Sequence, residues 1–443
     1  MARLFGTDGV RGVANRDLTP ELAFSLGRAA VQALAGGDRP RIVIGRDTRV
    51  SGPMLQAALS SGICSAGGDV IRLGVVPTPA VAFVTARLGA AAGAVISASH
   101  NPPPDNGIKF FSSDGRKLPD EVEDRIEGLV AEAGGPRPEG SDVGTVADAP
   151  GEVQGYLEHV LGAAEAPLGS MHVVVDCGYG AASGLAPEAL QRLGARVDAI
   201  NDEPIGERIN VDCGATRPDV VAQAVKAIGA DAGVAFDGDA DRALFADAEG
   251  NVIDGDQVIA ACALSLKRQG RLPRDTVVVT VMANLGLRRS LEGAGITVLE
   301  TQVGDRYVLE EMLRSGAGLG GEQSGHVVFL DQATTGDGLL TAVRFLSLAA
   351  ADGVGVADLA GAMRRYPQVL ENVRVEAPAA AVSGSAVSEA VLRAERALGG
   401  SGRILVRPSG TEPVVRVMVE AEAEEDARRH AADVAAAVRA ASG

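Results

Sequence analysis

The chain contains no tryptophan, only four cysteines, no excess of basic residues and no uninterrupted apolar run of membrane-spanning length. Its formal net charge of −17 argues against nucleic acid or an anionic membrane as a partner, because both repel a negatively charged surface. The longest apolar stretch, 80–98, is interrupted by Arg87, Gly89 and Gly93 and therefore predicts no membrane span. An anionic substrate would need local cations, either a metal ion or arginine, inside its site.

The cysteines show neither CxxC spacing nor a pairing pattern; they are Cys64, Cys177, Cys213 and Cys262. The first residues, MARLFGTDGVRG, contain no apolar core of the kind found in signal peptides. We therefore expect these thiols to be reduced and mostly buried in a cytoplasmic protein.

A strand, a polar loop and the start of a helix recur three times along the chain. A length of 443 residues is too great for one core and predicts about three or four domains. The pattern covers 41–102, 171–245 and 275–329, and its copies end in the loops SASHNP, DGDADR and GEQSGH. Short β-rich runs that alternate with helices are typical of mainly parallel sheets. Chance alignment of glycine-rich loops is the alternative explanation of this weak similarity.

The last part of the chain has a different pattern. Two strands around a turn, RILVRPSGTEPVVRVMVEA, lie between a helix expected from about Ser383 and a helix that starts at Glu424. The whole sequence predicts an α/β protein of three similar mixed α/β domains with mainly parallel sheets. A smaller C-terminal α+β domain completes it, with all four arranged around a central cleft. The expected domains are 1–150, 151–254, 255–370 and 371–443.

The loop SASHNPPPDNG follows an apolar run, Gly93 to Ile96, that predicts a short buried strand. Loops that follow strands are where α/β proteins place their chemistry. Ser99 lies at the start of this loop, with His100 and Lys109 close by in sequence. A solvent-facing turn is the alternative interpretation of such a serine.

Three carboxylates alternate in the second loop, at Asp237, Asp239 and Asp241. In an extended chain they would face one side, and such crowding of negative charge requires a cation. Oxygen ligands alone favour Mg²⁺, whereas Arg242 and Ala248 exclude an EF-hand. An aspartyl nucleophile of the haloacid-dehalogenase type is an alternative, disfavoured because those proteins have Thr or Val in place of Asp241. A solvated acidic turn is the second alternative.

Two further loops carry groups that suit a sugar phosphate. RPSGTEP (407–413) combines a guanidinium, two hydroxyls and a glycine amide, which together suit a phosphate group. GEQSGH (321–326) places Glu322, Ser324 and His326 after a glycine run, a set suited to sugar hydroxyls. Taken alone, the GEQSGH loop is more typical of a structural turn.

Taken together and in order, these four loops resemble the α-D-phosphohexomutase superfamily along essentially the whole chain. Within it, GTDGVRG, INVDCGAT (209–216), GEQSGH and TTGDG (334–338) are similar to the phosphoglucosamine mutase family. The resemblance implies four domains around a cleft, one loop from each, with a phosphorylated Ser99. The PPPD stretch after SHN departs from the aromatic or glycine residues of relatives, which bears on the loop's shape and not on its chemistry.

The resemblance also implies roles for individual residues. Mg²⁺ would be held by Ser99, as its phosphate, and by Asp237, Asp239 and Asp241. Catalysis would involve Ser99, Lys109, Arg242, His326 and Arg11. Substrate would be bound by His100, Glu322, Ser324, Arg407, Ser409, Gly410 and Thr411.

The implied reaction interconverts glucosamine 6-phosphate and glucosamine 1-phosphate through a 1,6-bisphosphate, feeding UDP-N-acetylglucosamine and cell-wall precursor synthesis. The expected cofactors are one Mg²⁺, phosphorylated Ser99 and glucosamine or glucose 1,6-bisphosphate as activator. Lys109 is the candidate general base, with His326 as the alternative, since a base needs a lowered pKa. We expect a monomer or homodimer that acts on a small sugar phosphate. A phosphomannomutase or phosphoglucomutase, a metal-dependent aspartyl phosphatase and a non-catalytic sugar-phosphate binder remain the alternatives.

Overall fold

The computed structural model describes residues 3–6, 8–34, 39–132, 134–135, 137–409 and 413–441. These residues form two compact units, which are treated separately below. One unit comprises Met1–Met282 with Ile296–Ala362, and the other Ala283–Gly295 with Met363–Gly443. Across the described ranges, no helix is both long and apolar enough to cross a membrane.

The first sheet of the larger unit has the strand order β1-β5-β4-β2-β3-β6. Its strands are β1 (Val10–Val13), β2 (Arg41–Arg46), β3 (Asp69–Val75), β4 (Ala92–Ile96), β5 (Asp105–Ser112) and β6 (Val146–Asp148). Strands β4, β2, β3 and β6 are parallel, whereas β5 runs antiparallel to both β4 and β1. The buried strand expected at 93–96 is confirmed as β4, all of whose residues are buried.

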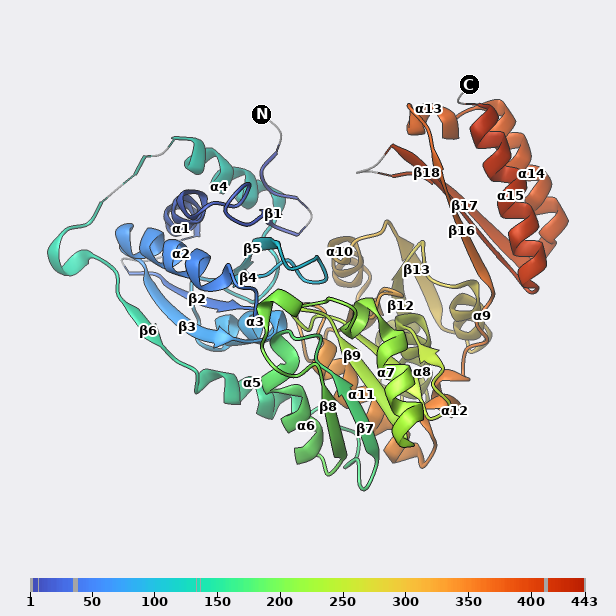
Figure 1. Ribbon diagram of the computed structural model, residues 1–443, viewed down its shortest axis with the longest axis horizontal. Helices are drawn as coiled ribbons and strands as arrows, with labels where there is room; N and C mark the ends of the chain where they lie inside the picture. Colours follow the sequence, from blue (N-terminus) through green and yellow to red (C-terminus); the bar gives the residue numbers. More distant parts are fainter. Residues whose placement is uncertain are drawn as a thin grey trace. The chain divides into compact units, whose positions relative to one another are not determined.

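Helices cover both faces of this sheet (Figure 1). Alternate residues such as Ile42 and Ile44 share one buried cluster with α1, α2 and α4. The opposite face has glycines, Gly45 and Gly93, where the side chain of Val81 on α3 packs closely. The helices are α1 (Pro20–Leu34), α2 (Gly52–Ser65), α3 (Thr78–Arg87) and α4 (Asp120–Glu132).

Two further sheets repeat the plan of parallel strands followed by an antiparallel return. The second has the order β11-β10-β9-β7-β8 and the third β13-β12-β14-β15. The strands of the second are β7 (His172–Asp176), β8 (Arg196–Ile200), β9 (Ala232–Phe236), β10 (Ala243–Asp247) and β11 (Val252–Ile253). Those of the third are β12 (Thr276–Thr280), β13 (Thr297–Thr301), β14 (Leu319–Gly321) and β15 (Val327–Phe329). The associated helices are α5 (Glu152–Leu161), α6 (Ala186–Arg192), α7 (Pro218–Ile228), α8 (Gly255–Arg268), α10 (Asp305–Ser315), α11 (Gly338–Asp352) and α12 (Val356–Ala360).

Each of the three sheets places one loop of the sequence pattern at the same point of its topology. The pairs β4/β5, β9/β10 and β14/β15 are antiparallel neighbours in sequence, and their connections are 97–104, 237–242 and 322–326. The prediction of three similar mixed α/β domains with mainly parallel sheets is therefore confirmed. The return strands explain why the three loops are equivalent: each closes a hairpin that begins with a buried strand.

The smaller unit is an antiparallel sheet of order β16-β18-β17 with helices on one face. Its elements are α9 (Leu285–Gly293), β16 (Gln368–Arg374), α13 (Pro378–Val382), α14 (Ser385–Leu398), β17 (Gly402–Pro408), β18 (Val414–Ala421) and α15 (Glu424–Ala440). Alternate valines of β18 join Ala427, Ala431 and Val434 of α15 in one core, which confirms the apolar stripe expected from Glu424. The fully buried Glu420 on β18 accepts hydrogen bonds from Asn284 Nδ2 and Leu285 N, so α9 belongs to this unit.

Candidate active site

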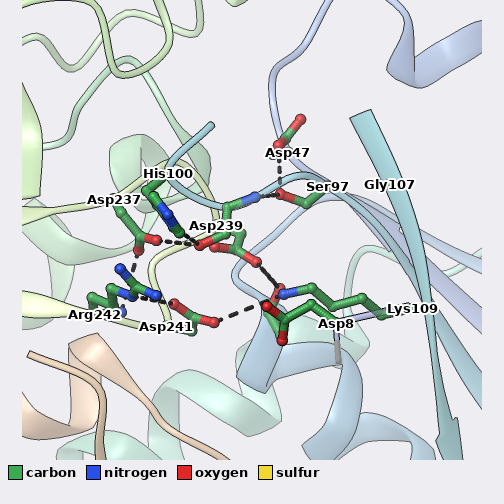
Figure 2. Close-up of polar contacts among 12 residues, drawn as sticks. Asp8, Asp47, Ser97, His100, Gly107, Lys109, Asp237, Asp239, Asp241 and Arg242 are labelled. Carbon is green, nitrogen blue, oxygen red and sulfur yellow. Dashed lines mark hydrogen bonds and ion pairs between the residues drawn. The ribbon is translucent and has the colours of Figure 1, made fainter. Parts of the chain in front are cut away.

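Ser99 is buried at the start of the loop between β4 and β5, with a left-handed backbone conformation of φ 51°. Its backbone N–H donates to Ser97 Oγ over 2.9 Å, and Ser97 Oγ donates to Asp47 Oδ2 over 2.6 Å. Its hydroxyl donates to Asp237 Oδ2 over 2.6 Å, and Figure 2 shows this acceptor, Asp237, with its neighbour Asp239. The structure therefore joins the serine of the first hairpin loop to the first aspartate of the second.

The three aspartates of the second loop converge, but not as predicted. Strand β9 ends at Phe236, and the Ala240 N–H closes a turn onto the Asp237 carbonyl. Ala240 itself is left-handed, with φ 54°. The expectation of an extended chain with three carboxylates on one side is therefore wrong: a turn, and not strand alternation, brings these groups together. Their ligand atoms nevertheless lie within 4.8 Å of one another.

The aspartate cluster has the features of a cation site. All three side chains are buried, and Asp239 Oδ1 and Asp241 Oδ1 have no hydrogen-bond partner among the described residues. Burial, together with the charges of Asp241 and Asp239, raises the pKa of Asp237 well above its ordinary value. Buried carboxylate oxygens that lack a hydrogen-bond donor, in an all-oxygen set, fit a hard divalent cation such as Mg²⁺. The residues present therefore fit the metal that the sequence pattern predicts.

Lys109, on β5, is the cation buried closest to the aspartates. Its Nζ lies 3.4 Å from Asp239 Oδ2 and 3.9 Å from Asp241 Oδ2. Burial favours the neutral amine, but the two carboxylates outweigh it and raise the pKa of Lys109. This direction is the opposite of what a general base needs. The arrangement supports Lys109 as a fixed positive charge, and the identity of the base stays a prediction.

Arg242 and Arg11 bring two more cations to the cavity. Arg242 Nε lies 3.9 Å from Asp241 Oδ1, and Arg11 is paired with Asp8 over 3.2 Å. Burial lowers the pKa of Arg242, but the Asp241 and Asp237 carboxylates outweigh it and raise the value. Both Arg242 Nε and Arg11 Nε are buried without a hydrogen-bond acceptor among the described residues. Such donors suit an anionic ligand.

Two histidines lie beside the serine and the aspartates, one on the serine loop and one on the third loop. His100 Nδ1 is 3.3 Å from Ser99 Oγ, and loss of hydration, with Arg242 and Arg11 nearby, lowers the pKa of His100 to about 4. His326 lies between Asp241 and Asp305, with 3.7 Å from Nδ1 to the first and from Nε2 to the second. Burial lowers the pKa of His326, but the Asp241 hydrogen bond and charge outweigh it. His326 is therefore held toward its protonated form, and His100 toward its neutral form.

The third loop contributes a carboxylate whose position is set by the backbone. Glu322 Oε1 accepts from the Gly304 N–H over 3.0 Å, and its Oε2 accepts from Ser324 Oγ over 3.2 Å. The motif TTGDG passes behind His326: a Cβ at Gly336 would overlap the His326 ring, so only glycine fits there. Asp337 of the same motif accepts from the Leu340 N–H and begins α11.

These groups line one cavity of about 220 Å³. Its walls are formed by Asp8, Arg11, Ser99, Lys109, Asp241, Arg242, Val303, Gly304, Asp305, Glu322 and His326. Residues from all three α/β sheets and their loops therefore face the same space. Of the predicted residues of the larger unit, His100, Ser324, Asp237 and Asp239 are not among those that line it. Asp237 is bonded to Ser99, Asp239 to Thr78, and Ser324 to Glu322.

The fourth predicted loop lies in the smaller unit. Arg407 is at the end of β17, directly opposite Arg416 on β18, and Ser409 N donates to the Val414 carbonyl to close the hairpin. Burial and the charge of Arg416 lower the pKa of Arg407. The predicted phosphate ligands Gly410 and Thr411 lie outside the described residues.

Sequence reasoning missed several residues that shape the site. Lys117 Nζ donates to Asp8 Oδ1 over 2.9 Å and also to Asp305, so it joins the N-terminal loop to the first residue of α10. Thr78 Oγ1 donates to Asp239 Oδ2 over 2.6 Å. Asp8 and Asp305 each follow a glycine-containing loop, which is a signal in the sequence, whereas nothing near Lys117 or Thr78 indicates these distant contacts.

A buried serine hydroxyl lies beside a carboxylate cluster, with arginines and a lysine around the same cavity, and these are the groups that phosphoryl transfer requires. Family models of phosphoglucomutase/phosphomannomutase match the chain throughout. The α/β/α domains I, II and III match residues 2–135, 154–250 and 254–366, and the C-terminal domain matches 370–437.

Curated relatives named phosphoglucosamine mutase include one from Symbiobacterium thermophilum, 56% identical over 99% of both chains. Another, from Moorella thermoacetica, is 56% identical over 96% of this chain and 97% of its own. A crystal structure of a phosphoglucomutase/phosphomannomutase family protein from Burkholderia thailandensis has a TM-score of 0.83 at 27% identity, covering 99% of this chain and 97% of that one. The chain therefore belongs to the phosphoglucomutase/phosphomannomutase family, whose members are phosphohexomutases, and within it to the phosphoglucosamine mutases.

Proposed function

We propose that this enzyme interconverts glucosamine 6-phosphate and glucosamine 1-phosphate through a phosphorylated Ser99 and a glucosamine 1,6-bisphosphate. The observation that carries the proposal is the 2.6 Å hydrogen bond from Ser99 Oγ to Asp237, which sets the serine directly against a cation-binding cluster. The names of the curated relatives support glucosamine as the sugar.

The proposed reaction has two transfers of one phosphoryl group each. First, the free hydroxyl of the monophosphate attacks phosphorus on Ser99; the P–Oγ bond breaks, and the hydroxyl proton passes to a base. The bisphosphate then turns, and Ser99 Oγ attacks the other phosphate, so that the released sugar hydroxyl takes back a proton. His326, which lines the same cavity, is the candidate for the proton-transferring group, because the raised pKa of Lys109, the other predicted base, favours a permanently charged side chain.

Charge stabilisation is the main demand of such a transfer, because the transition state spreads negative charge over the phosphoryl oxygens. Asp237, Asp239 and Asp241, with the phosphate on Ser99, would hold Mg²⁺. A bound Mg²⁺ would supply Lewis-acid neutralisation of the phosphoryl oxygens on the serine side. Arg242, Arg11 and Lys109 offer fixed positive charge to the same phosphate, and Arg242 Nε is free of hydrogen-bond acceptors among the described residues.

The remaining predicted residues bind substrate in this proposal. Glu322 and Ser324 contact sugar hydroxyls, and His100 contacts the substrate beside the serine. Arg407, Ser409, Gly410 and Thr411 bind the phosphate distant from Ser99. The predicted domains 1–150, 151–254, 255–370 and 371–443 carry the phosphoserine, metal, sugar and phosphate loops. We also propose a cytoplasmic monomer or homodimer, activated by glucosamine or glucose 1,6-bisphosphate.

A coupled assay that compares glucosamine, glucose and mannose phosphates tests this function. We expect the highest kcat/KM with glucosamine phosphate, Mg²⁺-dependent turnover and no turnover by Ser99→Ala. A higher kcat/KM with mannose or glucose phosphate would instead support a phosphomannomutase or phosphoglucomutase. Turnover by Ser99→Ala would refute the phosphoserine route and favour an aspartyl phosphatase, whereas absence of any turnover by the Mg²⁺-loaded wild type would favour a binding protein.

A further inference from the structure

Ser99 has a backbone conformation that it would not adopt without support. Its φ of 51° lies in the left-handed region, which costs a residue with a Cβ about 1–2 kcal/mol. Neighbouring groups must therefore hold the loop in this form. The direction of the Ser99 hydroxyl toward Asp237 depends on that backbone.

Two side chains hold the carbonyls on either side of His100. The fully buried Arg49 donates from Nη2 to the Ser99 carbonyl over 2.9 Å and to the Asn101 carbonyl over 2.7 Å. Asn210 Nδ2 donates to the same Ser99 carbonyl over 2.8 Å and to the same Asn101 carbonyl over 3.1 Å. Each carbonyl is thus shared by two donors that come from different parts of the chain.

The two donors differ in what else they do. Arg49 is bonded to Asp47 and also to the carbonyls of Pro102 and Asp105, so its removal would leave a buried carboxylate and several carbonyls without a donor. Asn210 belongs to the INVDCGAT motif of the second repeat, which has no role in the site described above. Its described side-chain donor bonds go only to the serine loop, and its own left-handed backbone, φ 60°, presents the amide there.

Asn210 also touches the aspartate loop. A Cβ at Gly238 would lie 2.7 Å from the Ser99 carbonyl oxygen and 2.9 Å from Asn210 Nδ2, so the loop between Asp237 and Asp239 passes directly against this hydrogen bond. The amide therefore lies where the serine loop and the aspartate loop meet. It acts on the reacting oxygen through the backbone, without contacting the cavity that would receive substrate.

We propose that Asn210 is a positioning residue for phosphoryl transfer: it fixes the Ser99 carbonyl and thereby directs Ser99 Oγ toward the aspartate cluster. This inference rests on the proposed phosphoserine route. It assigns a function to the INVDCGAT motif, namely attachment of the second repeat to the serine loop of the first.

Asn210→Gly tests the proposal, because glycine removes the amide and accepts the left-handed backbone without strain. The matched control is Asn201→Gly: Asn201 is also left-handed, with φ 49°, but its amide donates to Asp176 over 3.0 Å and not to the serine loop. We expect kcat of Asn210→Gly to fall about tenfold to a hundredfold, with KM within about twofold of wild type. The control should keep kcat within about twofold, and both variants should melt at similar temperatures.

A second measurement does not depend on turnover. Backbone hydrogen exchange of a peptide spanning 97–103 should become faster in Asn210→Gly and remain unchanged in Asn201→Gly. Asn210→Asp, which presents an acceptor to the two carbonyls, should lower kcat at least as far as the glycine variant. Equal losses of kcat in both glycine variants, or unchanged exchange at 97–103, would overturn the assignment. Wild-type protein without mutase activity would refute the proposed function instead, and the exchange result would still decide whether Asn210 holds the loop.

Discussion

Replacing Lys117 with methionine should destabilise the protein in a way that depends on pH. Lys117 Nζ lies between Asp8 and Asp305, and its side chain is only 15% exposed. Methionine keeps most of the apolar length but leaves two carboxylates facing one another. Removal of one partner from a fully buried ion pair costs about 3–5 kcal/mol, and from an exposed pair about 0–1 kcal/mol. For this partly buried triad we expect a loss of about 2–3 kcal/mol in the free energy of unfolding at pH 7.

The sign of the pH dependence follows from the carboxylates. Burial opposes ionisation of Asp8 and Asp305, but Lys117 and other cations outweigh it and lower both pKa values. A lowered pKa contributes stability above the unfolded value near 4, and that contribution disappears as the pH falls toward the folded value. At pH 3.5 part of this contribution should be lost, so the difference in the free energy of unfolding between wild type and variant should be smaller than at pH 7.

Urea unfolding at pH 7 and at pH 3.5 measures both effects. Lys267→Met is the matched control, because Lys267 pairs with Asp275 on the surface over 3.3 Å and should cost less than about 1 kcal/mol. Lys117→Arg should restore most of the lost stability. If Lys117→Met costs no more than the control, or the same at both pH values, the bridge between Asp8 and Asp305 does not stabilise the fold as argued.

Two further substitutions address the metal and phosphate groups. Asp239→Ala should abolish Mg²⁺-dependent turnover. It should leave the melting temperature of the metal-free protein unchanged or higher, because it relieves crowding among three carboxylates within 4.8 Å. Near-normal rates of the variant at limiting Mg²⁺ would contradict this prediction. Arg407→Ala should raise KM about tenfold to a hundredfold, the effect of a charge-assisted hydrogen bond of about 1.5–3 kcal/mol, and make turnover depend on added bisphosphate. Steady-state kinetics with and without glucose 1,6-bisphosphate measures both effects. An unchanged KM and an unchanged dependence on bisphosphate would mean that Arg407 does not bind the substrate phosphate.

The sequence predicted the elements of the fold because local patterns determine them. The strand at 93–96, the apolar stripe of α15 and the three equivalent loops each show their pattern within about 20 residues. The antiparallel strands β5, β10 and β15 were not foreseen. The pattern of a single strand does not show whether the chain returns beside it as a hairpin or crosses over to form a parallel neighbour. The turn at 237–241 was missed for a related reason: alternating aspartates look like a strand, and Ala240 gives no sign of its left-handed backbone.

Residues that act through distant partners could not be found in this way. Lys117 meets Asp305 across 188 positions, and Asn210 meets Ser99 across 111. Nothing near Lys117 in the sequence marks it, and the INVDCGAT motif around Asn210 does not show which residue Asn210 contacts; only the folded chain brings the two donors to their acceptors. The sequence drew attention to Ser99 and the aspartates because the loops that contain them concentrate unusual residues, and the structure brings these residues together. The distant contacts that hold such loops leave no comparable pattern in the sequence.

The equivalent loops of the three repeats form a site because their contacts cross from one repeat to another. Ser99 of the first repeat donates to Asp237 of the second, and Asp241 of the second faces His326 of the third. No single hairpin therefore contains a complete set of serine, cation ligands and histidine. The loops are equivalent in topology but differ in chemistry: one supplies the serine, one the carboxylates and one the histidine. Each sheet therefore keeps an apolar core. Buried charges, which destabilise a fold when they are unpaired, are confined to the region where the three loops bring opposite charges together.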